Sequence, residues 1–250
     1  MSQEYCGDAI AELPMTLAVG LMGSDGWVLA SDKRLYENTG TLQPDGKIIT
    51  GSIFSRTPKI HWVPEIGVAY TFAGDHASLL AGEALVADLK TNDCLPSARG
   101  TLLNRIGNQS WQSHMRDMAQ ANLKRDLLVI FTKPAPVQMW TVGLSVESTP
   151  SQHEDIALIG DTSNGAKIFP LLYYSQRSVK ELKVLAAHTI LMGHQCAQSL
   201  VEGLEMWTGT PDVKTTPPDE LQELAKRSDK IDRAICRQFK VAVHRSTQIL

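Results

Sequence analysis

The hydrophobic pattern near the start of the chain predicts two strands joined by a tight turn. Leu17, Val19 and Leu21 alternate with small residues, and a second apolar run covers residues 27–30. The turn signal Gly-Ser-Asp-Gly, at 23–26, separates the two runs. Alternation with a period of two residues is typical of a strand, and glycine and aspartate favour the connecting turn. We therefore expect a hairpin that ends at the charged cluster 32–34.

Farther along the chain, strand patterns and helix patterns follow one another. Short apolar runs predict strands at 66–73, 127–131, 137–142 and 156–160, with shorter strands at 48–49, 212–216 and 239–243. Apolar residues at helical spacing predict helices at about 75–89, 97–123, 165–174, 179–204 and 219–237. Asp75 is a candidate N-cap, and Ser178 with Glu181 matches a capping box. Residues 33–58 predict a connection, with a turn signal at 44–46.

This order of elements predicts the fold class α+β. Hairpins come first, two long helices lie between the strand regions, and more helix follows at the end. Each helix and each sheet must bury its apolar face against another layer. We therefore expect a four-layer αββα sandwich, in which two antiparallel sheets pack between two helical layers. The length of 250 residues suits one large domain.

Composition and charge narrow the class of partner. A net charge of −3 gives no reason to expect nucleic acid or an anionic membrane surface. The longest apolar runs, such as 127–131, are far shorter than the roughly 20 residues that span a bilayer. We expect a globular protein that has neither nucleic acid nor a membrane as its partner.

The cysteines and histidines do not form a metal-binding pattern. The four cysteines are widely spaced without a CxxC pair, and the seven histidines include neither an i, i+4 pair nor a spacing suited to zinc.

Residues 1–15 carry acidic residues and no sustained apolar stretch, unlike a secretory signal. We therefore expect no metal, reduced thiols and a cytoplasmic location.

Thr16 opens the first predicted strand and carries the most distinctive chemistry. If the chain began here, this residue would have both a hydroxyl and a free α-amine. Such an amine has an unperturbed pKa near ~8, so it can accept the proton of its own hydroxyl and create a nucleophile. Residues 1–15 would then be a leader, and residues 16–250 a single domain. The ordinary alternative is a plain strand residue, since threonine favours strands.

Three blocks of the sequence together resemble the proteasome β subunits and their bacterial relatives. The first is the hairpin that begins at Thr16 and ends in Asp32. The second is Lys59 followed by an apolar strand with Gly74 at its end, and the third is the strand pattern at 156–160. The resemblance spans roughly residues 16–207. It implies the N-terminal-nucleophile (Ntn) hydrolase fold. Within the family, the chain resembles the bacterial proteasome homologue of the betaproteobacterial type.

The resemblance implies a catalytic trio. Thr16 would be the nucleophile, Lys59 would lie beside its hydroxyl, and Asp32 would hold the lysine. Taken alone, Asp32 is most simply a loop carboxylate at a strand end. Lys59 alone is most simply a solvated lysine, as most lysines are. The joint placement of the two residues after Thr16 carries the catalytic interpretation.

The resemblance also places four supporting residues. Thr71 and Gly74 fall at the positions for oxyanion stabilisation and the substrate strand, where backbone N–H groups donate. Asp161 falls where the family supports the N-terminal amine with a serine, and Ser163, two residues on, is a second candidate for that support. An aspartate there would favour the ammonium form and raise the pKa of the amine. Met15, rather than the glycine usual in the family, precedes the expected new terminus.

The resemblance implies a threonine-type endopeptidase subunit that acts on peptides or unfolded proteins without a metal or organic cofactor. It also implies a homo-oligomer of stacked rings, similar to a tetradecamer. Two alternatives are a non-catalytic ring scaffold that keeps its leader, and an Ntn amidase that acts on small amides. Cleavage preference, ring stoichiometry and a regulatory ATPase partner do not follow from the sequence.

Overall fold

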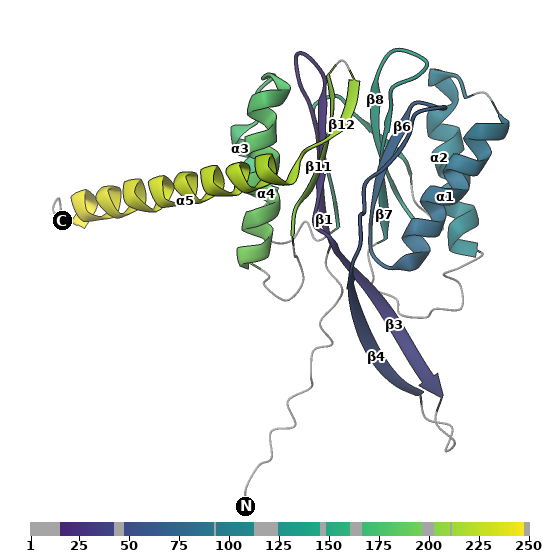
Figure 1. The fold of residues 1–250 in the computed structure, drawn as a ribbon, viewed down its shortest axis with the longest axis horizontal. Coiled ribbons are helices and arrows are strands. Elements are labelled where there is room, and N and C mark those ends of the chain that lie inside the picture. Colours follow the sequence, from purple (N-terminus) through teal and green to yellow (C-terminus); the bar gives the residue numbers. More distant parts are fainter. Residues whose placement is uncertain are drawn as a thin grey trace, which may run out of the picture.

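Two antiparallel sheets lie face to face between two helical layers in the computed structural model (Figure 1). The structure describes residues 16–42, 48–92, 94–112, 125–145, 149–160, 167–196, 203–210 and 212–247. The predicted α+β class and the four-layer αββα sandwich are confirmed.

Among the described residues, each of these two sheets has five strands. The first has the order β10-β1-β2-β11-β12 and is built from β1 (Leu17–Met22), β2 (Trp27–Ser31), β10 (Ile156–Gly160), β11 (Glu205–Thr210) and β12 (Asp212–Thr215). The second has the order β5-β6-β7-β8-β9 and is built from β5 (His61–Val63), β6 (Val68–Ala73), β7 (Asp126–Phe131), β8 (Gln138–Gly143) and β9 (Ser151–His153).

The helices cover the two outer faces. The second sheet is covered by α1 (His76–Thr91) and α2 (Arg99–Ser110), which follows the short 3₁₀ helix η1 (Pro96–Ala98). The first sheet is covered by α4 (Val179–Cys196), with α3 (Ile168–Tyr173) and α5 (Pro218–Thr247) packed against α4. Both predicted helix starts are confirmed, because Asp75 accepts a hydrogen bond from Ala77 N and Ser178 N donates to Glu181 Oε2.

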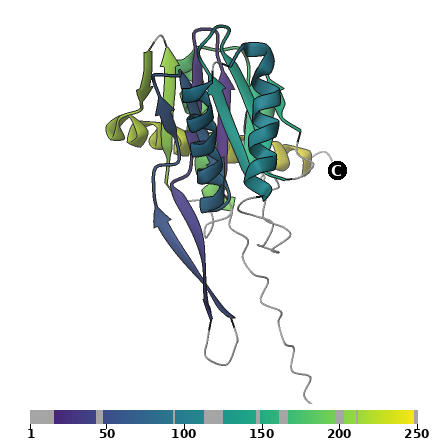
Figure 2. The ribbon, with the colours of Figure 1, turned by 90° about the vertical axis from the view of Figure 1, so that its right-hand side faces the viewer.

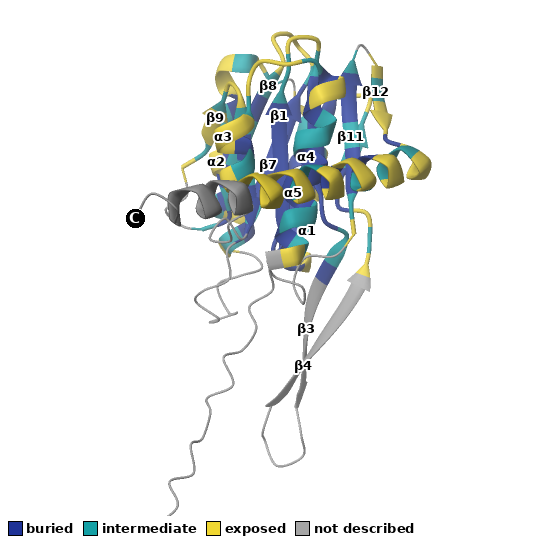
Figure 3. Cartoon of the chain, turned by 90° about the vertical axis from the view of Figure 1, so that its left-hand side faces the viewer, coloured by how far each residue is buried: buried dark blue, intermediate teal, exposed yellow. Residues whose placement is uncertain are grey.

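The alternation that predicts β1 sorts its side chains between two apolar layers. Leu17, Val19 and Leu21 pack toward α4, whereas Ala18 packs between the sheets. At Gly20 a Cβ atom would lie only 2.5 Å from the Met139 sulfur of the opposite sheet. Small residues on this face therefore let the two sheets approach closely. The buried strands form the centre of the molecule, and exposed residues lie on the outer faces of the helices and on the edge strands β9 and β12 (Figure 3).

A long two-stranded ribbon replaces the predicted connection at 33–58. β3 (Arg34–Leu42) pairs with β4 (Ile48–Arg56), and the ribbon projects from one end of the sandwich (Figures 1 and 2). The prediction of a short strand at 48–49 was therefore too brief. Since the two strands pair with each other and not with the main sheets, they need not show the alternation of a core strand.

Helix α5 corrects the prediction for the end of the chain. The strand expected at 239–243 is wrong, because α5 continues to Thr247. No glycine or proline follows Pro218 to end the helix. The helix runs outward beyond the body of the sandwich (Figure 1). Within the described residues, no helix is both long and apolar enough to cross a membrane.

Two further element boundaries differ from prediction. The helix predicted at 97–123 is described as α2 up to Ser110, and residues 113–124 lie outside the described residues. Strand β11 begins at Glu205, directly after the region predicted to be helical up to about residue 204. Sequence reasoning missed this strand, and one of its residues belongs to the site described next.

Candidate active site

The pairing of β1 with β2 places Thr16 beside Asp32. Ala18 lies opposite Ser31, so the residue before β1 and the residue after β2 meet at the same end of the hairpin. Two hydrogen bonds close this end: Leu17 N donates to Asp32 Oδ1 over 3.2 Å, and Asp32 N donates to Leu17 O over 3.2 Å. Proximity of these two residues follows directly from the hairpin register.

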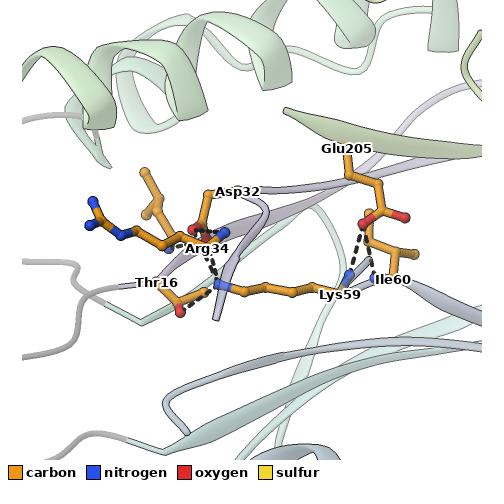
Figure 4. A network of polar contacts seen from close by, with 7 residues as sticks. Thr16, Asp32, Arg34, Lys59, Ile60 and Glu205 are labelled. Atoms are coloured by element: carbon orange, nitrogen blue, oxygen red, sulfur yellow. Dashed lines mark hydrogen bonds and ion pairs between the residues drawn. The ribbon is translucent and has the colours of Figure 1, made fainter. Parts of the chain in front are cut away.

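Lys59 reaches this pair from the segment that precedes β5. Its ammonium Nζ donates to Thr16 Oγ1 over 2.8 Å and to both carboxylate oxygens of Asp32, over 3.0 and 3.1 Å (Figure 4). Asp32 and Lys59 are 0% exposed, and Thr16 is 4% exposed. The structure therefore brings together the three residues to which the sequence assigned catalysis.

Burial acts on both members of the ion pair. Loss of water lowers the pKa of Lys59, and the charge and hydrogen bonds of Asp32 oppose that shift. Loss of water also raises the pKa of Asp32, and Lys59 opposes this shift together with the backbone N–H groups of Arg34 and Leu17. A buried charge is stable only when it is paired and hydrogen-bonded. The site therefore holds an ammonium, next to the threonine hydroxyl, that deprotonates more readily than a surface lysine.

Gly160 packs directly against the backbone of Thr16. This glycine ends β10, has φ +88°, and a Cβ atom built on it would collide with the Thr16 carbonyl group. The same atom would lie 3.2 Å from Ala73 Cβ, at the end of β6. The Gly160 N–H donates to Asp126 Oδ2 over 3.3 Å. Only a residue without a side chain allows this approach of β10, Thr16 and β6.

The two oxyanion and substrate-strand candidates lie on or next to β6. Thr71 is 0% exposed and faces Leu128 in the ladder with β7. Gly74 follows the strand with φ +110°. Its neighbour Ala73 is the β6 residue that adjoins Gly160. Of the two candidates, Gly74 is therefore the one that directly follows a residue in contact with the surroundings of Thr16.

An ion pair fixes the turn that contains Gly74. Arg125 binds Asp75 through Nε, at 3.0 and 3.1 Å, and through Nη2, at 2.7 Å. Asp75 also caps α1 by accepting from Ala77 N. Arg125 is 5% exposed, so this contact is shielded from water. The two predicted amine supports, Asp161 and Ser163, lie outside the described residues.

Glu205 belongs to the same network and was missed by sequence reasoning. Its Oε2 accepts from Lys59 N over 2.8 Å and from Ile60 N over 3.4 Å (Figure 4). Its Oε1 accepts from Trp207 Nε1 over 3.2 Å. The residue lay at the expected end of a helix, where a glutamate has no special meaning. Only recognition of β11 as a strand would have drawn attention to it.

Among the described residues, no group of three histidine, cysteine, aspartate or glutamate side chains is arranged to hold a metal ion. The chemistry that the site offers is that of a hydroxyl, an ammonium and two carboxylates.

No protein-family model matches the sequence, and no curated protein matches it. Solved structures do match the fold. Anbu (ancestral beta-subunit) from Yersinia bercovieri superposes with a TM-score of 0.68 at 14% identity, over 90% of this chain and 96% of that chain. The Anbu (Gly-1) mutant from Hyphomicrobium sp. strain MC1 gives a TM-score of 0.65 at 14% identity, with coverage of 90% and 96%. Anbu from the same Hyphomicrobium strain gives 0.63 at 13% identity, with coverage of 90% and 97%.

These neighbours correct the family expected from the sequence. The resemblance to the bacterial proteasome homologue of the betaproteobacterial type is wrong, because the three solved structures named above are Anbu proteins, a proteasome-like but distinct family. At 14% identity the likeness shows the fold. In this fold the hairpin is β1–β2, the strand that follows Lys59 in the second block is β6, and the third block is β10. Their order therefore identified the architecture but did not separate one branch from another.

Proposed function

We propose that this protein is a threonine-type N-terminal-nucleophile hydrolase that cleaves peptide bonds. The observation that carries the proposal is the 2.8 Å contact between Lys59 Nζ and Thr16 Oγ1, with Asp32 holding the same ammonium. A lysine buried against a threonine hydroxyl is costly to maintain, and such perturbed groups gather at functional sites. The fold shared with Anbu is consistent with this chemistry.

Activity requires a free α-amine on Thr16. Hydrolysis of the bond between Met15 and Thr16 would remove the leader 1–15 and leave the domain 16–250. The Thr16 amine then accepts the proton of its own hydroxyl, directly or through a water, while Oγ1 attacks the substrate carbonyl carbon. The amine next transfers that proton to the leaving nitrogen, the C–N bond breaks, and an ester joins the acyl group to Oγ1. Attack by water on the ester releases the acid and restores the hydroxyl.

Lys59 and Asp32 prepare the hydroxyl for attack. The ammonium stabilises negative charge as it develops on Oγ1, and the low-dielectric surroundings strengthen that effect. Asp32 keeps the lysine protonated and oriented. The backbone N–H of Gly74, or of Thr71, would donate to the oxyanion of the tetrahedral intermediate. Asp161 or Ser163, which follow Gly160 in the chain, would hold the amine.

We further propose that the subunits assemble as a homo-oligomer of stacked rings that acts on peptides or unfolded proteins. Support comes from α3, whose apolar residues Ile168, Leu171 and Leu172 are 49%, 62% and 67% exposed. Such a contiguous apolar surface is typical of a contact between protein chains. The lack of closely spaced cysteine pairs in the sequence suits work in the cytoplasm.

Two measurements test the proposed function. Mass spectrometry of the purified protein should show a chain that begins at Thr16, and fluorogenic peptides should be turned over. Thr16→Ala should abolish turnover, whereas Thr101→Ala, on the exposed face of α2, should leave it unchanged. An intact leader without turnover would instead support the ring scaffold. Turnover of small acyl amides but not of peptides would support the amidase.

A further inference from the structure

Two carboxylates hold the two ends of Lys59. Asp32 binds the ammonium, and Glu205 binds the backbone of the same residue (Figure 4). We propose that Glu205 is a positioning residue, which sets the place of Lys59 relative to the Thr16 hydroxyl. This inference rests on the proposed hydrolase function.

The contacts of Glu205 use both of its oxygens. One oxygen accepts from the consecutive N–H groups of Lys59 and Ile60, over 2.8 and 3.4 Å. The other accepts from the Trp207 indole over 3.2 Å. The residue is 8% exposed. Hydrogen bonds to an ionised carboxylate are about twice as strong as neutral ones, so this contact fixes the backbone at Lys59 firmly.

The topology explains why Lys59 needs such a contact. Thr16 and Asp32 flank strands of the first sheet, whereas Lys59 precedes β5 of the second sheet. Glu205 begins β11, which pairs with β2 so that Glu205 lies opposite Ser31, the neighbour of Asp32. The carboxylate therefore ties the lysine segment to the sheet that carries the other two residues. A displacement of about 1 Å between reacting groups can cost about 100-fold in rate.

The charge of Glu205 also acts on the lysine. Among the described residues, Asp32 and Glu205 both favour the protonated form of Lys59 and oppose the effect of burial on its pKa. Loss of this charge should make Lys59 lose its proton more easily, and loss of the backbone contact should lengthen the distance from Lys59 Nζ to Thr16 Oγ1. A residue that only braced the fold would change stability without lengthening that distance.

The test uses three variants of the processed protein. Glu205→Gln keeps the size of the side chain but removes its charge, and its amide must place an N–H group against either the backbone donors or the indole. Trp207→Phe removes the indole donor that orients Glu205 but keeps an aromatic ring at this position. Glu223→Gln is the matched control, because Glu223 is 50% exposed and pairs with Arg227 on the surface of α5.

We expect Glu205→Gln to lower kcat by about 10- to 100-fold with little change in KM, because the lysine loses its place. The alkaline limb of the kcat/KM profile should move to lower pH, because the Lys59 proton is lost more easily. Trp207→Phe should lower kcat by roughly a few fold, because Glu205 keeps its charge but loses the hydrogen bond from the indole. Glu223→Gln should match the parent protein. A Glu205→Gln protein with parental kcat and an unmoved alkaline limb would overturn the inference.

A crystal structure of Glu205→Gln gives a readout that does not depend on turnover. We expect the separation of Lys59 Nζ from Thr16 Oγ1 to increase beyond hydrogen-bonding distance from its present 2.8 Å. A retained contact refutes the positioning role, even if the parent protein proves inactive. Absence of turnover in the parent protein refutes the proposed function alone. Should Glu205→Gln fail to fold, Trp207→Phe is measured in its place. Parental kcat together with an unchanged distance from Lys59 Nζ to Thr16 Oγ1 would then overturn the inference.

Discussion

Lys59 and Asp32 form a buried ion pair at the root of the β3–β4 ribbon. The ribbon leaves the body at Arg34, just after Asp32, and returns at Arg56, just before Lys59. Thr57 N donates to Lys33 O over 3.0 Å and closes this root. A long excursion of the chain therefore brings the carboxylate and the ammonium back to the same point beside Thr16.

Replacing one partner of this ion pair should be far more damaging than replacing both. Asp32→Asn leaves the Lys59 ammonium buried without its countercharge, and we expect a loss of about 3–5 kcal/mol in the free energy of unfolding. The double variant Asp32→Asn with Lys59→Met should recover much of that loss. Peptide turnover should fall at least about 100-fold in both proteins, because neither keeps an oriented ammonium to stabilise charge on Thr16 Oγ1. Urea denaturation and peptide turnover measure the two effects, and an additive double variant would contradict the expectation.

A methyl group at Gly160 should displace Thr16. Gly160→Ala places a Cβ against the Thr16 carbonyl and forces alanine to φ +88°. The backbone strain alone costs about 1–3 kcal/mol. We expect a lower melting temperature, and impaired release of the leader and peptide turnover. Gly107→Ala, within α2, is the comparison, since its Cβ would lie 3.2 Å from Val142 Cγ2 and 3.3 Å from Gly143 O, close contacts that need only a small shift. Equal effects of the two substitutions would argue against a special role for Gly160.

Arg125 tests the turn that contains Gly74. Arg125→Lys keeps the positive charge but loses the two-pronged contact with Asp75. We expect a destabilisation of about 1–3 kcal/mol, as for hydrogen bonds to charged groups. If Gly74 donates to the oxyanion, kcat should fall while KM changes little.

The matched control for this change is Arg105→Lys. Arg105 pairs with Asp88 but is 51% exposed, so the substitution should cost about 0–1 kcal/mol. An Arg125→Lys protein that is as stable and as active as Arg105→Lys would exclude a role for the turn.

Stability should decrease as the solution becomes acidic, in part through His188. This residue is 2% exposed, its Nδ1 lies 2.8 Å from Ser228 Oγ, and burial lowers the pKa of its ring. The unfolded chain, with a histidine pKa near ~6.5, binds the proton more readily than the folded protein. The stabilisation is therefore present above that pH and is lost as the pH falls below it.

Free energies of unfolding at neutral and mildly acidic pH check this prediction. His188→Gln should show a smaller loss on acidification than the parent protein. Some loss should persist, because burial also lowers the pKa of His61 and His153. The same pH dependence with and without His188 would disprove its contribution.

Elements that depend on local interactions could be predicted from the sequence. Alternation in 17–21 and the turn at 23–26 specify the β1–β2 hairpin, and that pairing alone places Thr16 beside Asp32. The capping signals at Asp75 and Ser178 located two helix starts, because each needs only hydrogen bonds to the next turn. The succession of strands and helices was enough to predict four layers.

Contacts between residues that are distant in the chain could not be predicted in this way. Lys59 is 43 residues from Thr16, and no local rule shows that its ammonium lies at that hydroxyl rather than in water. The roles of Glu205 and Gly160 depend on the pairing of β11 and β10 within the first sheet. Glu205 contributes a carboxylate to the site, and Gly160 leaves room for Thr16 because it has no side chain. Pairing between strands and exclusion of water are properties of the assembled sheets, so a single stretch of sequence does not contain them.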